Sequence, residues 1–173
     1  MAAACEELWA KDDGETLLAH TLKVIEMSQQ ICDRLPFPAE ARNDLAKLLA
    51  EVCAFHDLGK ATVGFQTTLR LKTSWGHRHE ILSTALAHLI DPDLIGAGLL
   101  AILTHHRSLP ESLTTEDEKC LPDDELPPCL GGDEEVWHQI VGELKGDWVA
   151  LRDCLEHICE WASLPVRIPE EVS

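Results

Sequence analysis

An all-α fold is the class that this sequence predicts, and three observations support it. The chain of 173 residues has no tyrosine and only 5% aromatic residues, so its core must be built mainly from Leu, Ile, Val and Ala. That composition favours helices over strands. Apolar residues recur at helical spacing in several segments, and no segment shows the period-two alternation typical of a strand.

The first predicted helix runs from Glu15 to about Leu35, after an irregular lead-in that ends in a turn at residues 12–14. Its apolar residues lie on or beside one face: Leu17, Leu18, Leu22, Ile25, Ile31 and Cys32. Pro36 and Pro38 break this pattern.

A second helix is predicted from Pro38 to Phe55, with proline at an acceptable first-turn position. Its inward residues are predicted to be Leu45, Leu48, Leu49, Val52 and Phe55. The helix should stop near residues 56–59, where Gly59 can adopt the left-handed conformation that closes helices.

The remaining chain predicts a short helix at 61–69, a loop at 71–76, and helices at 77–89 and 93–106. Residues 107–133 form an acidic, proline-rich excursion, and a last helix is expected over 134–163, with an interruption at Gly142 or Gly146. We expect one domain over residues 1–164 and a tail or linker over 165–173.

Charge and cysteine content limit the classes of function. The formal net charge of -17 argues against autonomous, tight binding to DNA, because neutralising phosphates dominates such affinity. A nucleic-acid substrate would need another protein to deliver it. The seven cysteines form no CxxC pair, which fits reduced thiols, and no apolar run is long enough to cross a bilayer. We therefore expect a cytoplasmic protein that does not interact with membranes.

Nine histidines are many for an acidic chain, and their placement is more informative than their number. Four separate segments carry histidine within or at the end of a predicted helix: His20, His56 with Asp57, His79, and His105 with His106. Any one of these could be an ordinary helix residue, and that is the interpretation we give to the others, His77, His88, His138 and His157. The four segments together indicate a metal site, because a buried imidazole is costly unless it is paired or ligated.

Imidazoles and a carboxylate make a mixed nitrogen and oxygen shell that suits Mn²⁺, Fe²⁺, Co²⁺, Ni²⁺ or Zn²⁺. Asp57 could bridge two ions that together activate water and bind phosphate oxygens. Lys60 could direct its charge at the phosphate or anchor the site by hydrogen bonding. Equally, it could be a solvated lysine favoured by the helix dipole.

The order H, HD, H, HH resembles the HD superfamily of metal-dependent phosphohydrolases, which are helical bundles with a metal site between the helices. The segments WAKDDGETLLAHTLKV, FHDLGKATVGFQ, HRHEILS and LTHHRSL are similar to the HD nuclease of type I CRISPR systems. The resemblance covers roughly Trp9 to Leu109, and its FHDLGK…FQ and RHE…S parts are the more specific ones.

The resemblance implies a role for each matching residue. His20, His56 and Asp57 match the ligands of one divalent metal, and Asp57 bridges to a second ion held by His79, His105 and His106; the metal could be Mn, Ni, Co, Fe, Mg or Zn. Asp57 and Lys60 match catalytic positions. In this family a late aspartate usually completes the first site. Here Asp147 is the nearest match, although the residues around it differ from the family motif, and Asp153 is another possible donor. Either could equally be a helix-surface acid.

Three hypotheses follow. The leading one is an HD nuclease that cuts single-stranded DNA, with RNA as a further candidate substrate, in CRISPR interference. Its expected partners are a fused or separate CRISPR helicase and a guide-RNA surveillance complex. The second is a phosphohydrolase of small nucleotides, which the charge of -17 favours. The third is a non-catalytic module that docks to a partner through the acidic residues 111–125.

Overall fold

The computed structural model describes residues 8–73, 78–91, 93–94, 96–106, 148–166 and 168–170. Its helical elements are α1 (Leu17–Arg34), α2 (Ala39–Phe55), the 3-10 helix η1 (Leu58–Ala61), α3 (Val63–Leu71), α4 (His79–Ile90), α5 (Ala97–Thr104) and α8 (Trp148–Ala162). These ranges contain no strand, only an isolated antiparallel bridge between Trp9 and Thr16. The predicted all-α class is confirmed.

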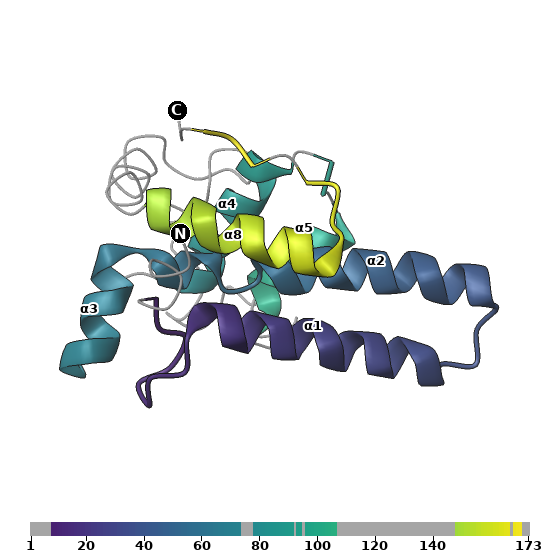
Figure 1. The fold of residues 1–173 in the computed structure, drawn as a ribbon, viewed down its shortest axis with the longest axis horizontal. Coiled ribbons are helices and arrows are strands. Elements are labelled where there is room, and N and C mark those ends of the chain that lie inside the picture. Colours follow the sequence, from purple (N-terminus) through teal and green to yellow (C-terminus); the bar gives the residue numbers. More distant parts are fainter. Residues whose placement is uncertain are drawn as a thin grey trace, which may run out of the picture.

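Helices α1 and α2 form a long antiparallel hairpin, and α8 packs against both of them (Figure 1). Helix α4 packs against η1 and α5, and α5 also contacts α2. The ends of α2, α4 and α5 therefore meet around η1. No helix in the described ranges is long and apolar enough to span a bilayer.

The core lies where these helices meet. Its largest fully buried side chains come from every long helix: Leu17, Ile25, Phe55, Leu58, Ile81, Leu82, Leu86, Ile102, Leu151, Leu155 and Ile158. Aliphatic residues dominate this set, as the composition predicts.

The inward face of α1 differs from the predicted one. Its buried residues are Leu17, Thr21, Ile25, Ser28 and Cys32. Ile31, expected beside this face, is 56% exposed. Thr21 and Ser28 take part because their spacing continues the buried stripe, and the Ser28 hydroxyl is satisfied by donating to the Ile25 carbonyl at 2.8 Å.

In α2 the buried residues are Ala50, Val52, Cys53, Ala54 and Phe55. Val52 and Phe55 were predicted correctly, whereas Leu48 is 38% exposed. The burial concentrates in the last turns because these lie beneath the other helices, while the start of α2 belongs to the projecting hairpin (Figure 1).

Gly59 does not close α2 in a left-handed conformation. It lies within η1, and the positive φ angles among described glycines are at Gly14 and Gly96. A Cβ at Gly59 would collide with the carbonyl oxygen of His79 and would lie 2.8 Å from Leu82 Cβ. Glycine is needed here because the backbones of η1 and α4 approach closely.

Other predicted boundaries shift by a few residues. The short helix α3 begins after Thr62, whose hydroxyl accepts from the Phe65 amide at 3.4 Å, and α5 is shorter than the predicted 93–106. The acidic stretch 107–133, the first part of the last predicted helix, and the glycines expected to interrupt it lie outside the described residues.

The stretch expected to be a tail contacts the core. Val166 and Ile168 are partly buried against it, and Trp148 Nε1 donates to the Glu170 carbonyl at 3.0 Å. The domain boundary at residue 164 remains a prediction.

Candidate metal centre

Asp57 is the centre of the candidate site. It lies at the junction between α2 and η1 and is only 2% exposed. The histidines reach it mostly from helix ends: His56 and His105 follow the last residues of α2 and α5, and His79 is the first residue of α4. His20 comes from the first turns of α1.

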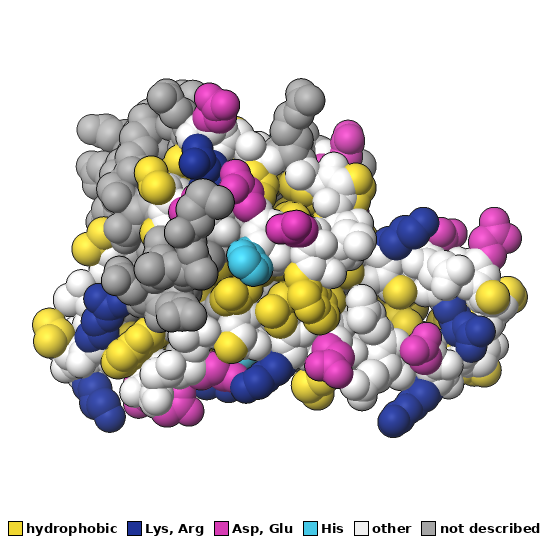
Figure 2. All heavy atoms as spheres, viewed as in Figure 1, with side chains coloured by type: hydrophobic (Ala, Val, Ile, Leu, Met, Phe, Trp, Pro, Cys, Tyr) yellow, Lys and Arg dark blue, Asp and Glu magenta, His cyan; other side chains and the backbone are white. Residues whose placement is uncertain are grey.

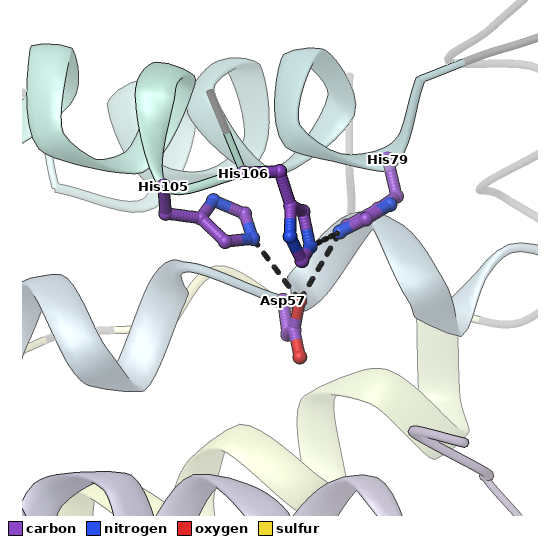
Figure 3. Close-up of side chains that lie close together, drawn as sticks. All are labelled: Asp57, His79, His105 and His106. Atoms are coloured by element: carbon purple, nitrogen blue, oxygen red, sulfur yellow. Dashed lines mark hydrogen bonds and ion pairs between the residues drawn. The ribbon is translucent and has the colours of Figure 1, made fainter. Parts of the chain in front are cut away.

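Four imidazoles point their Nε2 atoms at the Asp57 carboxylate. His20 Nε2 and His56 Nε2 each lie 3.3 Å from Oδ2. His79 Nε2 lies 3.3 Å from Oδ1, and His105 Nε2 lies 3.5 Å from it. Figure 3 shows His79, His105 and His106 converging on Asp57 from one side.

The potential ligand atoms fall into two groups that share Asp57. One consists of Asp57, His79, His105 and His106, and the other of His20, His56 and Asp57; within each group the ligand atoms lie within 4.8 Å of one another. The fold thus brings together all six side chains of the motif segments. The grouping is the same as that implied by the family resemblance.

The other ring nitrogens are held by acceptors. His56 Nδ1 and His105 Nδ1 lie 2.7 Å from the carbonyls of Cys53 and Ile102, and His20 Nδ1 lies 3.3 Å from Glu15 Oε2. A carbonyl can only accept, so His56 and His105 carry a proton on Nδ1. Their Nε2 atoms are then the ones available to a metal.

The local chemistry fits a cation. Among the described residues, Asp57 Oδ1 and His105 Nε2 are buried side-chain atoms without a hydrogen-bond partner. His79 Nε2 and His106 Nε2 face each other at 3.0 Å. Lone pairs aimed at one small volume are costly when unsatisfied, and a divalent ion would satisfy them together.

The protonation of the site also fits ligation. Burial alone would raise the pKa of the Asp57 carboxyl, but the imidazoles of His105, His20, His56 and His79 outweigh it and hold that pKa well below its usual range. Burial lowers the pKa of His79, and burial with the neighbouring His105 lowers the pKa of His106 to about 4. Near neutral pH these two imidazoles are uncharged, so each has one ring nitrogen free to bind a metal.

Lys60 is part of this buried network. It is 7% exposed, and its Nζ donates to Asp57 Oδ2 at 2.9 Å. The alternative interpretation of Lys60 as a solvated helix-end lysine is therefore wrong. Its ammonium also lies 6.0 Å from the centre of the Phe65 ring.

Three polar residues near the site were not singled out from the sequence. Glu15 contacts His20, Glu80 Oε2 lies 3.6 Å from His79 Nδ1, and Gln66 donates to the Lys60 carbonyl at 2.7 Å. All three occur in the quoted motif segments, so the family resemblance could have pointed to them. Their contacts depend on the fold and have no local pattern of their own.

The sequence offers two further sets of residues: Asp147 and Asp153 as possible late donors, and His77, His88, His138 and His157 as ordinary helix residues. Asp147 lies outside the described residues, as do His77 and His138. Asp153, His88 and His157 are described and belong to neither group; Asp153 lies 3.8 Å from Arg152 Nη2.

The surface of the described residues mixes both charge signs. On the face shown in Figure 2, Lys and Arg side chains are scattered among Asp and Glu and exposed hydrophobic groups. This face offers little to attract a polyanion at long range.

A helical domain with clustered imidazoles around one buried aspartate is the architecture of a metal-dependent hydrolase. The family model described as "Cas3, HD domain" matches residues 9–167. The chain therefore belongs to the Cas3 HD-domain family, and the predicted relation to the HD nucleases of CRISPR systems is confirmed. No curated protein and no solved structure matches the chain significantly.

Family membership defines the general activity. Such a domain is a CRISPR-associated, metal-dependent nuclease, and HD domains bind divalent metals.

Proposed function

We propose that this domain cleaves single-stranded DNA during CRISPR interference, with one or two divalent ions held by the six motif side chains. The observation that carries the proposal is the convergence of four imidazole Nε2 atoms, 3.3–3.5 Å away, on the buried carboxylate of Asp57. A cluster of this kind in a member of the Cas3 HD-domain family supports hydrolysis of a phosphodiester.

The proposed ligands of the first ion are His20, His56 and Asp57. Those of the second are Asp57, His79, His105 and His106. When bound, divalent ions supply positive charge for the phosphate oxygens and a water that is acidic enough to serve as nucleophile. The protein side chains hold the ligands in place, and no side-chain nucleophile is required.

Asp57 can belong to both groups of metal ligands because each of its oxygens faces a different pair of imidazoles. Oδ2 faces His20 and His56, and Oδ1 faces His79 and His105. The lowered pKa of the carboxyl keeps it ionised near neutral pH.

Lys60 is proposed to act beside the reacting phosphate. Its Nζ is bonded to Asp57 Oδ2, so its positive charge lies next to the proposed ions and is largely shielded from water. A cation in this position would orient Asp57 and stabilise negative charge on the phosphate.

The charge of the chain supports a dependence on partners. A domain of net charge -17 gains little from phosphate neutralisation, so we propose that a CRISPR helicase, fused or separate, and a guide-RNA surveillance complex deliver the strand. The proposed late ligand, Asp147, remains a prediction from the sequence.

The test is a cleavage assay on circular single-stranded DNA with added Mn²⁺, run in parallel with nucleoside triphosphates and single-stranded RNA. We expect cleavage of DNA that is abolished by EDTA and lost in Asp57→Ala, because removing the shared carboxylate affects both groups. Hydrolysis of nucleotides without cutting of strands would support the small-nucleotide alternative. Cleavage that survives EDTA would contradict the proposal.

A further inference from the structure

His20 differs from His56 and His105 in how its Nδ1 atom is held. His56 and His105 follow the last residues of helices, where carbonyls are left without intrahelical partners, and each uses the carbonyl three residues back. His20 lies inside α1, where carbonyls are engaged in the helical ladder. Its Nδ1 therefore needs a partner from outside the helix, and that partner is Glu15 Oε2 at 3.3 Å.

The Glu15 carboxylate is fixed from two sides by lysines. Lys11 Nζ lies 2.6 Å from Oε2, and Lys23 Nζ lies 2.6 Å from Oε1. Held between two ammonium groups, the carboxylate acts as an acceptor towards His20 Nδ1. The two cations together exceed its single negative charge, so Glu15 orients the ring without adding net negative charge beside Asp57.

The backbone of Glu15 is equally constrained. Its N–H donates to Asp13 Oδ1 at 3.0 Å, and its carbonyl accepts from the Ala10 amide at 2.7 Å. Gln66 holds the preceding segment by accepting from the Trp9 amide and donating to the Trp9 carbonyl, both at 2.9 Å. Glu15 thus reaches His20 from a segment that is tied to α3 through Gln66.

We infer that Glu15 is a positioning residue that fixes the Nδ1–H tautomer and the orientation of His20, and so directs His20 Nε2 to the ion shared with His56 and Asp57. This inference rests on the proposed function, because it assumes an ion at that group. Carboxylate partners of ligating histidines contribute to metal affinity by restricting the ring and raising its basicity.

The inference predicts an asymmetric effect of substitution. The Nδ1 partners of His56 and His105 are backbone carbonyls, which no side-chain substitution removes, whereas Glu15→Ala removes the partner of His20 alone. Affinity should fall for the ion held by the His20 group and remain for the ion held with His79, His105 and His106.

The experiment is a calorimetric titration of the metal-free protein with Zn²⁺, for wild type, Glu15→Ala, Glu15→Gln and the control Glu26→Ala. Glu26 is an exposed acid on α1, the helix that carries His20, so the control removes the same charge away from the site. We expect Glu15→Ala to weaken one class of Zn²⁺ binding by about 10- to 100-fold and Glu26→Ala to leave both classes unchanged.

A second readout follows the His20 ring itself. In Zn²⁺-loaded, ¹⁵N-histidine-labelled protein, we expect a slowly exchanging Nδ1–H resonance of His20 in wild type and in Glu15→Gln, whose amide oxygen can still accept, and loss of that resonance in Glu15→Ala. If Glu15→Ala does not fold, Glu15→Gln decides: a retained resonance with less than about tenfold weaker binding supports the inference. A lost resonance with unchanged affinity overturns it.

The outcomes separate this inference from the proposed function. Glu15→Ala that matches Glu26→Ala in both readouts would overturn the positioning role, while the metal site would stand. Wild-type protein that binds no Zn²⁺, Mn²⁺ or Mg²⁺ would overturn the proposed function and the inference with it.

Discussion

Lys60 Nζ lies 2.9 Å from Asp57 Oδ2, and this contact joins two buried charges in the middle of the candidate metal centre. It is shorter than the contacts of 3.3–3.5 Å that the Asp57 carboxylate makes with the four imidazoles. A buried carboxylate needs such partners to remain ionised. The lysine therefore bears on stability as well as on the proposed chemistry.

Lys60→Met keeps the apolar stem and removes the cation. Without metal, we expect the free energy of unfolding to fall by about 3 kcal/mol, because one partner of a buried ion pair is lost. With Mn²⁺ the loss should be smaller, because bound ions would supply charge to Asp57. Urea unfolding with EDTA and with Mn²⁺ measures both values.

The matched control is Lys47→Met at an exposed lysine of α2, which should change the free energy of unfolding by less than about 0.5 kcal/mol. Equal destabilisation by Lys60→Met in EDTA and in Mn²⁺ would argue against a cation beside Asp57.

Gly59→Ala tests the close approach of η1 and α4. The added methyl group would collide with the His79 carbonyl, which belongs to the backbone and cannot turn away. We expect a loss of about 3 kcal/mol in the free energy of unfolding, together with weaker metal binding as His79 moves from Asp57. Thermal unfolding and Zn²⁺ titration provide the measurements.

Gly98→Ala is the comparison, because its methyl group would meet side-chain atoms and no backbone: Leu94 Cδ1 at 2.6 Å, Leu94 Cγ at 3.3 Å and Leu48 Cδ1 at 3.6 Å. These side chains can move, and alanine favours the helix, so the stability should stay within about 1 kcal/mol of wild type. Similar losses of stability in the two variants would show that the contact with the His79 backbone does not require glycine at position 59.

Gln66→Glu tests the attachment of the segment before α1. Glutamate cannot donate to the carbonyls of Trp9 and Lys60, which Gln66 reaches at 2.9 and 2.7 Å. We expect the segment to loosen and trypsin to cleave after Lys11 at least several-fold faster, because proteolysis follows local opening. Gln29→Glu, at an exposed position of α1, should leave this cleavage rate unchanged.

Cys159 provides a pH test away from the metal centre. Burial, with a contribution from Glu51, raises the pKa of this thiol to about 11, from an ordinary value of 9.0. The folded protein therefore keeps a proton that the unfolded chain releases as the pH rises above 9. This contribution to stability is complete below about pH 9 and is lost towards about pH 11.

Urea unfolding under reducing conditions, at about pH 8 and about pH 10.5, should show a smaller loss of stability for Cys159→Ala than for wild type. Identical losses for the two proteins would contradict the raised pKa.

The sequence predicted the fold class and the convergence of the motif histidines better than it predicted the faces of helices. Thr21 and Ser28 are buried in α1 while Ile31 is exposed. From hydropathy alone, Ile31 would be expected to be buried and Thr21 and Ser28 to be exposed. Which side of a helix is covered depends on the neighbouring helices, and periodicity alone does not contain that information.

The role of Gly59 and the contacts of Glu15 illustrate the same limit. A glycine after a helix most often indicates a left-handed cap, but here the constraint comes from α4, twenty residues further along the chain at His79. Glu15 is five residues from His20, outside the usual helical spacing, and their contact depends on a turn that precedes the helix. Such contacts are properties of the tertiary structure.

The account depends on divalent ions binding around Asp57. The most direct measurement is the number of Mn²⁺ ions bound per chain at equilibrium, in wild type and in Asp57→Asn, which keeps the shape of the side chain and removes its charge. We predict one or two ions for wild type and a loss of at least about tenfold in affinity for every ion in Asp57→Asn, because both groups share this carboxylate. Equal binding by the two proteins, or none by wild type, would contradict the account.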